Sequence, residues 1–543
     1  MSQYKKIIFI FSFLTISILV IVLIQSYRSS IISETVNTEP AISQELIDQG
    51  KQLSAIYCTS CHIYPEPELL TKSVWRSQTL PAMGPKMGIY QHRGVEYRYS
   101  REPHVPENYY PSDPQLSSDE WDKIIAYYVH EAPEYFPPSV RNPEITIDSL
   151  FFKPHIPDYR TDSPPASTIA RFDPGNQLLY LSDIEGTNLL IFNRQLELEN
   201  SLFLSATLSD VHILNNPDEA GRRDLVLTYL GSLVPSDVPE GFIVRTAYDP
   251  TPGNTSGGFI DVILEDLVRP VETIHADLNR DSYNDLLISE FGHRSGSLFW
   301  ISGNERGEFN HEPNLLMDEP GCIQSYAIDY NGNGFQDVIA LCTQLNQQIY
   351  LFENSGNGEF SRSTLLQFRV TAGSSSFELA DFNKDGHLDI LYTSGDNADF
   401  SIAFKPYHGV YIYLNDGDNN FSKEWFYPVN GAYDAKARDF NGNGNLDIAV
   451  ISFFGDYVNH PEEGFLFFKN DAEDSLSFTP FHHPATAAGR WIAMDVADWT
   501  GNGFDDILLS NYSIGPDMNR EQAQMDEVFT QGPLFLLLEN ISE

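Results

Sequence analysis

DFNKDGHLDIL, residues 381–391, decides the fold of most of the chain, because its pattern recurs at regular intervals. Side chains with oxygen donors occupy positions 1, 3, 5 and 9, and an apolar run follows. The other copies are DLNRDSYNDLL from Asp277, DYNGNGFQDVI from Asp329, DFNGNGNLDIA from Asp439 and DWTGNGFDDIL from Asp498. Successive copies start 52, 52, 58 and 59 residues apart. A fixed period of this length predicts one structural unit per copy.

The donor spacing favours calcium. Calcium takes six to eight hard oxygen ligands, and a tight loop brings alternate side chains to one point. Position 7 would add its backbone carbonyl, and glycine at position 6, as in Gly386, permits the turn. The alternative is an Asx-rich turn without metal. The predicted ligands for up to five calcium ions are Asp277, Asn279, Asp281, Asp285, Asp329, Asn331, Asn333, Asp337, Asp381, Asn383, Asp385, Asp389, Asp439, Asn441, Asn443, Asp447, Asp498, Thr500, Asn502 and Asp506. Loops with only two carboxylates, at Asp329, Asp439 and Asp498, should bind more weakly.

These loops resemble FG-GAP repeats, also called VCBS repeats, which form the blades of integrin-type propellers. Two degenerate copies precede them, one keeping Asp173 and the other Asp224. Neither keeps the full set of ligands, so we expect no calcium there. The resemblance therefore implies an all-β propeller of seven blades over residues 166–543. Each blade reads as a calcium loop, strand two, a loop, strand three, an Asn/Gly turn and strand four. The last copy ends with strand three, so we expect residues 148–154 to supply the outer strand and close the ring.

CTSCH, residues 58–62, predicts covalent attachment of haem c. Cys58 and Cys61 would form thioethers with the haem vinyl groups, and His62 would bind the iron. The alternatives are a redox dithiol and half of a zinc site, but the chain has no second CxxC motif to complete a zinc site.

The flanks of CTSCH predict two helices, one over residues 43–57 and one that starts with a capping box at Ser117 and Glu120. Together they resemble a small all-α class I cytochrome c domain over residues 41–136. In the loop LPAMGPKMG, Met83 is the preferred sixth iron ligand and Met87 is the alternative. A histidine ligand is also open, and its candidates are His92, His104 and His130.

The N-terminus predicts export from the cytoplasm. Lys5 and Lys6 precede eighteen largely apolar residues, Ile7 to Ile24, which as a helix would span about 27 Å. Residues 1–30 are therefore a candidate signal anchor in the inner membrane of a bacterial envelope, with the rest on the periplasmic side. A cleaved signal peptide is the alternative, and would leave the protein free in the periplasm. The net charge of −43 argues against a nucleic-acid partner, since that contact needs a basic surface.

Two further features are a linker between the domains and a possible disulfide. The proline-rich stretch after Ala132 reads as a linker, and residues 137–165 join the two domains while containing the possible closing strand. Cys322 and Cys342 flank one calcium loop on strands expected to be adjacent and antiparallel. In an oxidising compartment a disulfide between them is feasible, and two buried thiols are the alternative.

The loops between strands two and three, together with those between blades, should emerge on the propeller face opposite the calcium loops. Long polar loops on one face of a repeat ring usually mark the functional face. The candidate recognition residues are His293, Arg294, Asp396, Asn397, Asp399, Lys405, Tyr407, His408, Asp456, His460, Arg490 and Trp491. The alternative is that these loops are solvated and bind nothing.

Three functions follow from this organisation. The leading one is an exported c-type haem protein that carries electrons and uses a calcium-stabilised propeller for docking or substrate recognition. The second is a periplasmic oxidoreductase whose propeller face oxidises a sugar or alcohol and passes electrons to haem. The third is a carbohydrate- or protein-binding module. The expected partner is a redox protein or a small-molecule electron donor, and no catalytic triad, phosphate loop or nucleotide fingerprint identifies a reaction.

Overall fold

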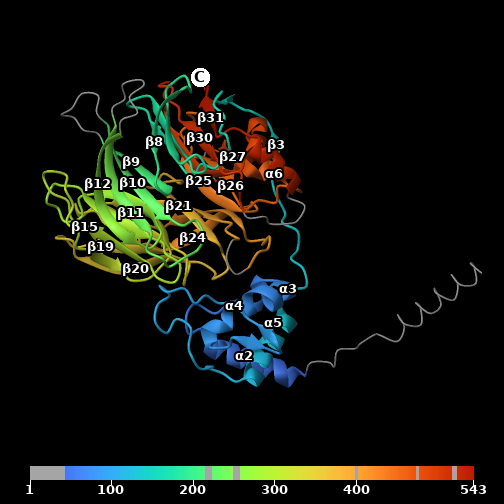
Figure 1. Ribbon diagram of the computed structural model, residues 1–543. Helices are drawn as coiled ribbons and strands as arrows, with labels where there is room; N and C mark the ends of the chain where they lie inside the picture. The colour runs from blue at the N-terminus through green and yellow to red at the C-terminus, as the bar shows by residue number, and fades with distance from the viewer. Residues whose placement is uncertain are drawn as a thin grey trace, which may run out of the picture.

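The computed structural model describes residues 43–214, 223–248, 257–397, 401–472, 476–515 and 523–542. The predicted anchor over residues 1–30 lies outside these ranges. Within them, none of the helices combines the length and apolar character needed to cross a membrane. The described chain forms a small, mostly helical domain followed by a large propeller, and the two lie against each other (Figure 1).

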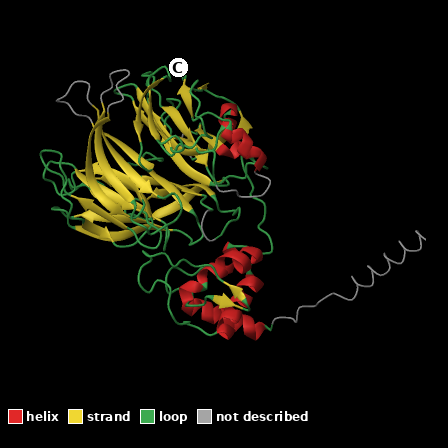
Figure 2. Cartoon of the chain, in the orientation of Figure 1, coloured by secondary structure: helices red, strands yellow, loops and turns green. Residues whose placement is uncertain are grey.

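The small domain is built around two helices, α2 and α5, that pack against each other and are joined by shorter turns (Figure 2). Its elements are α2 (Gln44–Tyr57), η1 (Pro67–Leu69), α3 (Lys72–Val74), η2 (Trp75–Thr79), α4 (Leu80–Met83), η3 (Pro85–Met87), β1 (Gln91–His92), β2 (Val95–Glu96) and α5 (Ser118–Glu131). The hairpin of β1 and β2 corrects the expectation of an all-α domain. Its strands pair at only two positions, and such a short stretch carries no periodic signal in the sequence.

Both long helices begin where their caps predict. The Ser43 side chain accepts a hydrogen bond from the N–H of Leu46, and Ser117 and Glu120 form the predicted capping box. The helices touch at Gly50, where an added Cβ would lie 2.2 Å from the carbonyl oxygen of Lys123. Glycine therefore permits the close crossing of α2 and α5.

Seven four-stranded antiparallel blades form the propeller, one of them with an added edge strand (Figures 1 and 2). Blade one has β5 (Ala170–Asp173), β6 (Leu178–Asp183), β7 (Asn188–Phe192) and β8 (Leu198–Phe203); blade two has β9 (Thr207–Leu214), β10 (Arg223–Gly231), β11 (Gly241–Tyr248) and β12 (Gly257–Leu267). Blade three has β13 (Pro270–Ala276), β14 (Asp285–Glu290), β15 (Ser297–Ile301) and β16 (Asn314–Met317); blade four has β17 (Cys322–Ile328), β18 (Asp337–Cys342), β19 (Gln348–Asn354) and β20 (Phe360–Gln367).

The remaining blades follow the same order. Blade five has β21 (Ser374–Ala380), β22 (Asp389–Ser394), β23 (Gly409–Asn415) and β24 (Phe421–Pro428); blade six has β25 (Ala432–Arg438), β26 (Asp447–Ser452), β27 (Phe465–Asn470) and β28 (Phe478–His482). Blade seven has β29 (Trp491–Ala497), β30 (Asp506–Asn511), β31 (Phe535–Asn540) and β4 (Phe152–His155). Three short helices lie in the connections: η4 (Pro461–Gly464), η5 (Pro484–Ala488) and α6 (Ala523–Thr530).

The outer edge of blade seven is covered by chain that precedes the propeller in sequence. β4 pairs antiparallel with β31, with Phe152 opposite Asn540 and His155 opposite Leu537. β4 overlaps the last three residues of the segment expected to close the ring, 148–154, and extends one residue beyond it. A second strand, β3 (Thr146–Ile147), pairs parallel with β28 and extends blade six. The segment 137–165 is therefore bound along two blades.

Hydrogen bonds around the central axis join neighbouring blades. A carboxylate on the first strand of one blade accepts the backbone N–H of the next: Asp210 from Thr273 at 3.2 Å, Glu272 from Ser325 at 2.7 Å and Glu378 from Ala437 at 2.5 Å. Asp495 of blade seven accepts from Phe172 of blade one at 2.7 Å, which connects the last blade to the first. These bonds satisfy inner-strand N–H groups that would otherwise lack partners.

Cys322 and Cys342 are directly opposite each other on β17 and β18 and form a disulfide. Of the two arrangements that the sequence left open, the structure has the bonded one. Both cysteines belong to the buried cluster shared by blades three and four.

Candidate functional site

The helical domain is docked on the propeller face that carries the loops between strands two and three (Figure 1). Tyr407 donates a hydrogen bond to the carbonyl of Leu69 at 2.8 Å, and the N–H of Ile402 donates to Gln78 at 2.8 Å. Tyr407 also belongs to the hydrophobic cluster at the centre of the helical domain. The two domains therefore share a core and several directional contacts.

A second set of contacts fixes the opposite side of the junction. Arg294 donates to the hydroxyl of Tyr110 at 3.2 Å and packs over the rings of Tyr109 and Tyr110. Its guanidinium is held by Asp237, with 2.7 Å between nitrogen and carboxylate oxygen. Burial opposes ionisation of Asp237, but the hydrogen bonds from Arg294 and Ser295 hold its pKa below the ordinary value. Sequence reasoning missed Asp237, since a single aspartate in a loop carries no pattern.

The predicted recognition residues are thus distributed unevenly. Those at the domain junction are Arg294, Asp396, Asn397, Lys405 and Tyr407, and His293 lines an adjoining hollow. His408 is buried beside Tyr407, and burial holds its pKa well below the ordinary value. Asp456 binds its neighbour Asn459, His460 contacts the linker residue Arg141, and Arg490 and Trp491 are buried in the propeller. Asp399 lies outside the described residues.

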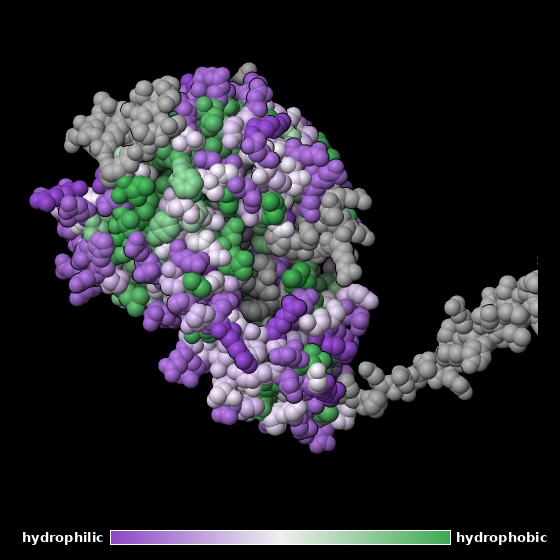
Figure 3. Space-filling model, in the orientation of Figure 1, coloured by the Kyte–Doolittle hydropathy of each residue, from purple (hydrophilic) through white to green (hydrophobic). Residues whose placement is uncertain are grey.

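These loops were predicted to form a recognition face, and the chain's own helical domain lies over part of it. The face of the molecule seen in Figure 3 shows the helical domain, mostly hydrophilic on its surface, directly against the propeller. Tyr407 is 9% exposed and packs in the hydrophobic cluster of the helical domain, so burial of its ring stabilises this arrangement.

A cavity of about 260 Å³ lies at the junction and contains the CTSCH motif. Its helical wall carries Cys58, Cys61 and His62 together with both candidate methionines, Met83 and Met87. Aromatic and aliphatic side chains complete this wall, and they include Trp75, Leu80, Trp121 and Tyr128. The opposite wall belongs to the propeller and is mostly polar, with Gln344, Thr371, Asp396, Asn397 and Lys405 among its residues.

The surroundings of His62 and Cys58 shift the pKa values of these two residues in opposite directions. Nδ1 of His62 lies 2.8 Å from the carbonyl oxygen of Ile63, so this nitrogen donates and leaves Nε2 as the acceptor. Burial lowers the pKa of His62, which favours the neutral ring that binds metals. Burial raises the pKa of Cys58 to about 11. A redox dithiol needs a stabilised thiolate, and Cys58 has the reverse environment.

These residues fit an iron porphyrin. Two sulfur atoms, an imidazole with a free Nε2 and two thioether side chains open into the same cavity, and large apolar side chains flank them. His92 and His130 are engaged with other side chains: His92 contacts Asp122, and His130 contacts Glu131.

The five predicted calcium loops all connect strand one to strand two of their blades. In the loop of blade five, Asp381 accepts hydrogen bonds from the N–H groups of Asp385 and Gly386 at 3.2 and 2.9 Å. Asp385 accepts from His387 at 2.8 Å, so successive side chains fold back over the loop. Backbone φ is positive at position 6 in all five loops, including +74° at Ser282 and +89° at Gly386. Glycine in four loops removes the strain of that conformation.

The aspartate at position 9 has a role that the ligand pattern did not predict. Asp389 is fully buried, and its two carboxylate oxygens accept the N–H of Phe382 at 2.8 Å and of Asn415 at 2.9 Å. It therefore joins the loop to the end of strand three. All five copies accept an N–H from the end of strand three, at Gly303, Asn354, Asn415, Asn470 and Asn540. The recurring asparagine at that strand end was the available sequence signal.

Two buried oxygens in these loops have no hydrogen-bond partner among the described residues. Oδ2 of Asp439 accepts from Gly444 at 2.8 Å, whereas Oδ1 is buried and unpaired. Oγ1 of Thr500, at position 3 of its loop, is also buried and unpaired. Among the described residues no three His, Cys, Asp or Glu side chains converge on one point. A cation here would thus need amide, hydroxyl and carbonyl oxygens as well.

In the two degenerate loops the aspartates contact other side chains of the protein. Asp224 lies at the start of β10, where the other blades have their position 9 aspartate, and the guanidinium of Arg245 is 2.6 Å from its carboxylate. Asp173 accepts from Asn176 in a short turn. An arginine at the first of these sites places a positive charge where calcium would bind.

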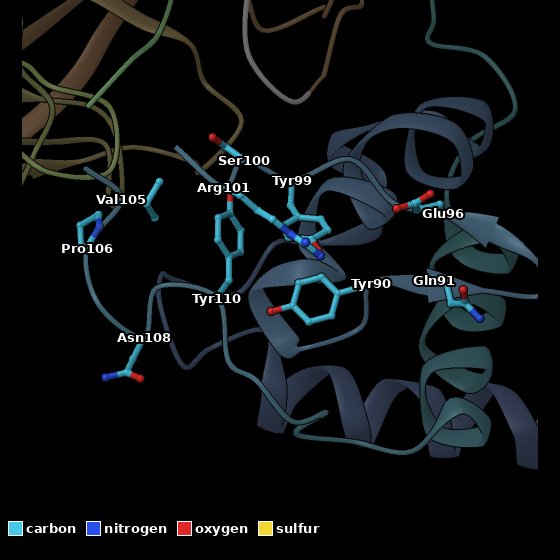
Figure 4. Close-up of a pocket in the computed structure, with 10 residues that line it drawn as sticks. All are labelled: Tyr90, Gln91, Glu96, Tyr99, Ser100, Arg101, Val105, Pro106, Asn108 and Tyr110. Atoms are coloured by element: carbon cyan, nitrogen blue, oxygen red, sulfur yellow. The ribbon is translucent and has the colours of Figure 1, made fainter. Parts of the chain in front are cut away.

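A separate open pocket of about 500 Å³ lies in the long loop of the helical domain (Figure 4). The rings of Tyr90 and Tyr99 are 4.5 Å apart and those of Tyr99 and Tyr110 are 5.7 Å apart. Arg101 packs over Tyr99, with 4.9 Å between its guanidinium carbon and the ring centre. None of the CTSCH residues lines this pocket, so we regard the cavity at the junction as the candidate site.

Comparison with known proteins supports the repeat. Residues 329–392 match the family model described as FG-GAP-like repeat. The search of curated proteins finds no match. Similar solved structures include BBS1N in complex with ARL6DN, at 11% identity over 70% of this chain and 93% of that chain with a TM-score of 0.40. Regucalcin, a calcium-binding protein from Agrobacterium tumefaciens, matches at 12% identity over 61% of this chain and 98% of that chain, with a TM-score of 0.35.

Proposed function

We propose that this chain is an exported c-type haem protein in which the propeller closes the haem cavity and receives the electron donor. One observation carries the proposal: CTSCH, Met83 and Met87 open into a cavity whose second wall consists of propeller loops. Cys58 and Cys61 would hold the porphyrin through thioethers, and Nε2 of His62 would bind the iron. Bound haem would supply one-electron redox chemistry. The disulfide in blade four accords with an oxidising compartment.

The position of the cavity favours a donor that reaches the domain junction, since the polar wall and the helical wall meet there. Oxidation of a sugar or alcohol at this junction is the alternative, and binding of a carbohydrate or protein is a third. The test is to express the chain with haem attachment machinery and to screen sugars, alcohols and reduced redox proteins as donors. Reduction of the bound iron by a small molecule identifies an oxidoreductase, and reduction by protein partners alone identifies an electron carrier. Failure of every donor would contradict both redox functions.

Replacing Met83 by alanine should lower the reduction potential of the bound haem by an amount on the order of 0.1 V, because a thioether ligand favours ferrous iron. Met87→Ala is the matched control, since Met87 lines the same cavity and should leave the potential nearly unchanged. Potentiometric titration followed by absorbance gives both values. The reverse pattern would identify Met87 as the ligand, and no change in either variant would exclude methionine ligation.

We further propose that the five loops between strands one and two of blades three to seven bind calcium. The unpaired Oδ1 of Asp439 supports this, because a buried carboxylate oxygen without a partner is costly unless a donor or cation meets it. Calcium would also offset the repulsion among carboxylates in a chain with a net charge of −43.

Chelation by EDTA should therefore lower the melting temperature of the propeller. For each loop, calcium at 100 times its dissociation constant contributes about 2.7 kcal/mol to stability. Differential scanning calorimetry with and without calcium measures the shift, and added calcium should restore the first value. A matching experiment with magnesium controls for ionic strength. An unchanged melting temperature after chelation would remove calcium from the proposal.

A further inference from the structure

A short loop of the propeller contacts the backbone directly after the predicted iron ligand. The loop consists of residues 343–347 and joins β18 to β19 in blade four. Oδ1 of Asn346, in this loop, accepts a hydrogen bond from the N–H of Ile63 at 3.3 Å. The two residues belong to different domains, so the propeller binds the backbone beside His62.

Ile63 is also the residue that orients His62. Its carbonyl oxygen lies 2.8 Å from Nδ1 of His62 and accepts the N–H of that nitrogen. Ile63 therefore directs its N–H to the propeller and its carbonyl to the imidazole. A hydrogen bond of this kind fixes the orientation of a metal-binding histidine ring and raises the basicity of its other nitrogen. A residue that fixes the position of Ile63 thus acts on Nε2 of His62.

The first end of the loop is anchored on its own blade. The N–H of Thr343 donates to the carbonyl oxygen of Gly321 at 2.8 Å, and the next residue on each side is a cysteine of the disulfide between Cys322 and Cys342. A Cβ added at Gly321 would lie 2.5 Å from the backbone nitrogen of Gln344. Glycine therefore permits the loop to pass close to β17, and the disulfide holds the two strands together at that point.

The second end of the loop is anchored on blade five. Gln347 is only 7% exposed, and its Nε2 donates to the carbonyl oxygen of Val370 at 2.8 Å. Its Oε1 accepts the N–H of Ser374 at 2.8 Å. Since both ends of the loop are fixed, the side chain of Asn346 is presented to Ile63 from a rigid support.

We propose that Asn346 is a positioning residue that orients the iron-binding ring of His62 through the backbone of Ile63. The inference rests on the proposed function, because it concerns a ligand of bound haem. Hydrogen bonds around an axial ligand are one of the means by which a protein sets the reduction potential of haem. The propeller would therefore take part in setting that potential through a side chain that does not bind the iron.

The first measurement is amide hydrogen exchange in the reduced, full-length holoprotein, followed by NMR with isotope-labelled isoleucine. Asn346→Ala removes the acceptor, so exchange at Ile63 should become about tenfold faster. Exchange at Ile402 should stay unchanged, because its N–H is bonded to Gln78 at a separate contact of the same junction. The two isoleucines thus distinguish loss of one hydrogen bond from separation of the domains.

The second measurement is potentiometric titration of the same variant. At a fixed potential the ratio of ferrous to ferric haem should rise about threefold, because an imidazole without a firmly placed acceptor is a weaker donor to ferric iron. Gln344→Ala is the matched control, since it shortens an amide side chain of the same loop and should leave both measurements near wild type. Asn346→Asp keeps an acceptor oxygen and should keep slow exchange at Ile63.

Several outcomes would overturn the positioning role while the haem protein itself stands. They are wild-type exchange at Ile63 in Asn346→Ala, faster exchange without a change in the redox ratio, and an equal change in Gln344→Ala. Equally fast exchange at Ile402 would also overturn it, because the effect would then come from separation of the domains. A wild-type chain that takes up no covalent haem would give a different result: it would overturn the proposed function, and the positioning role with it.

Discussion

A chain in which Cys58 and Cys61 are both replaced by alanine should be colourless after expression with haem and its attachment machinery. The two sulfur atoms are the only groups in the cavity that can form thioethers, and the other two cysteines are joined in the propeller. Wild type should retain its haem absorbance after extraction in acidified organic solvent, and the variant should retain less than about a tenth of it. Mass spectrometry should show the added mass of haem in wild type alone.

The matched control is the pair Cys322→Ala and Cys342→Ala, which removes the same number of cysteines from a blade remote in sequence from CTSCH. This control should remain coloured, although loss of the disulfide should reduce stability by about 3 kcal/mol for a loop of this length. Covalent haem in the Cys58 and Cys61 variant, or its absence from wild type, would contradict haem attachment at CTSCH.

Replacing Asp389 by alanine should destabilise the propeller by about 4 kcal/mol even without calcium. The substitution leaves the buried N–H groups of Phe382 and Asn415 without their acceptor, and each hydrogen bond to a charged group contributes about 1.5–3 kcal/mol. Urea unfolding in EDTA, followed by tryptophan fluorescence, should show the propeller transition at a lower urea concentration.

Asp385 in the same loop is the control. Its side chain is exposed, so Asp385→Ala should change stability little in EDTA but should weaken the stabilisation that calcium gives. The two variants thus separate the structural aspartate of the loop from a proposed calcium ligand. Equal effects of both substitutions in EDTA would show that the hydrogen bonds of Asp389 do not determine stability.

Several features could be predicted from sequence because they depend on local pattern. The copies of DFNKDGHLDIL repeat at intervals typical of propeller blades. Five such copies and two degenerate ones predicted seven blades, and the missing last strand predicted an edge strand at residues 148–154. The structure has seven blades and places β4 at that edge. The capping box at Ser117 and Glu120 is confirmed for the same reason, since a helix start depends on residues three positions apart.

Other features depend on residues that are far apart in the chain. The contact between Tyr407 and Leu69 joins positions 338 residues apart, and no sequence pattern near either residue predicts it. No local pattern predicts the ion pair between Asp237 and Arg294 either. The same is true of the position of Asn397 in the lining of the cavity that contains CTSCH. The hairpin of β1 and β2 was missed because two residues per strand give no period.

By itself the sequence determined the repeat unit, the seven blades and the position of CTSCH at the end of a helix. These follow from spacing and capping, which act over a few residues and recur. Only the tertiary structure decided that the helical domain covers the propeller loops and that both domains line one cavity. The reason is physical: the residues that pack around Tyr407 and those that form the two walls of the cavity lie far apart in the sequence, and local propensity carries no information about such partners.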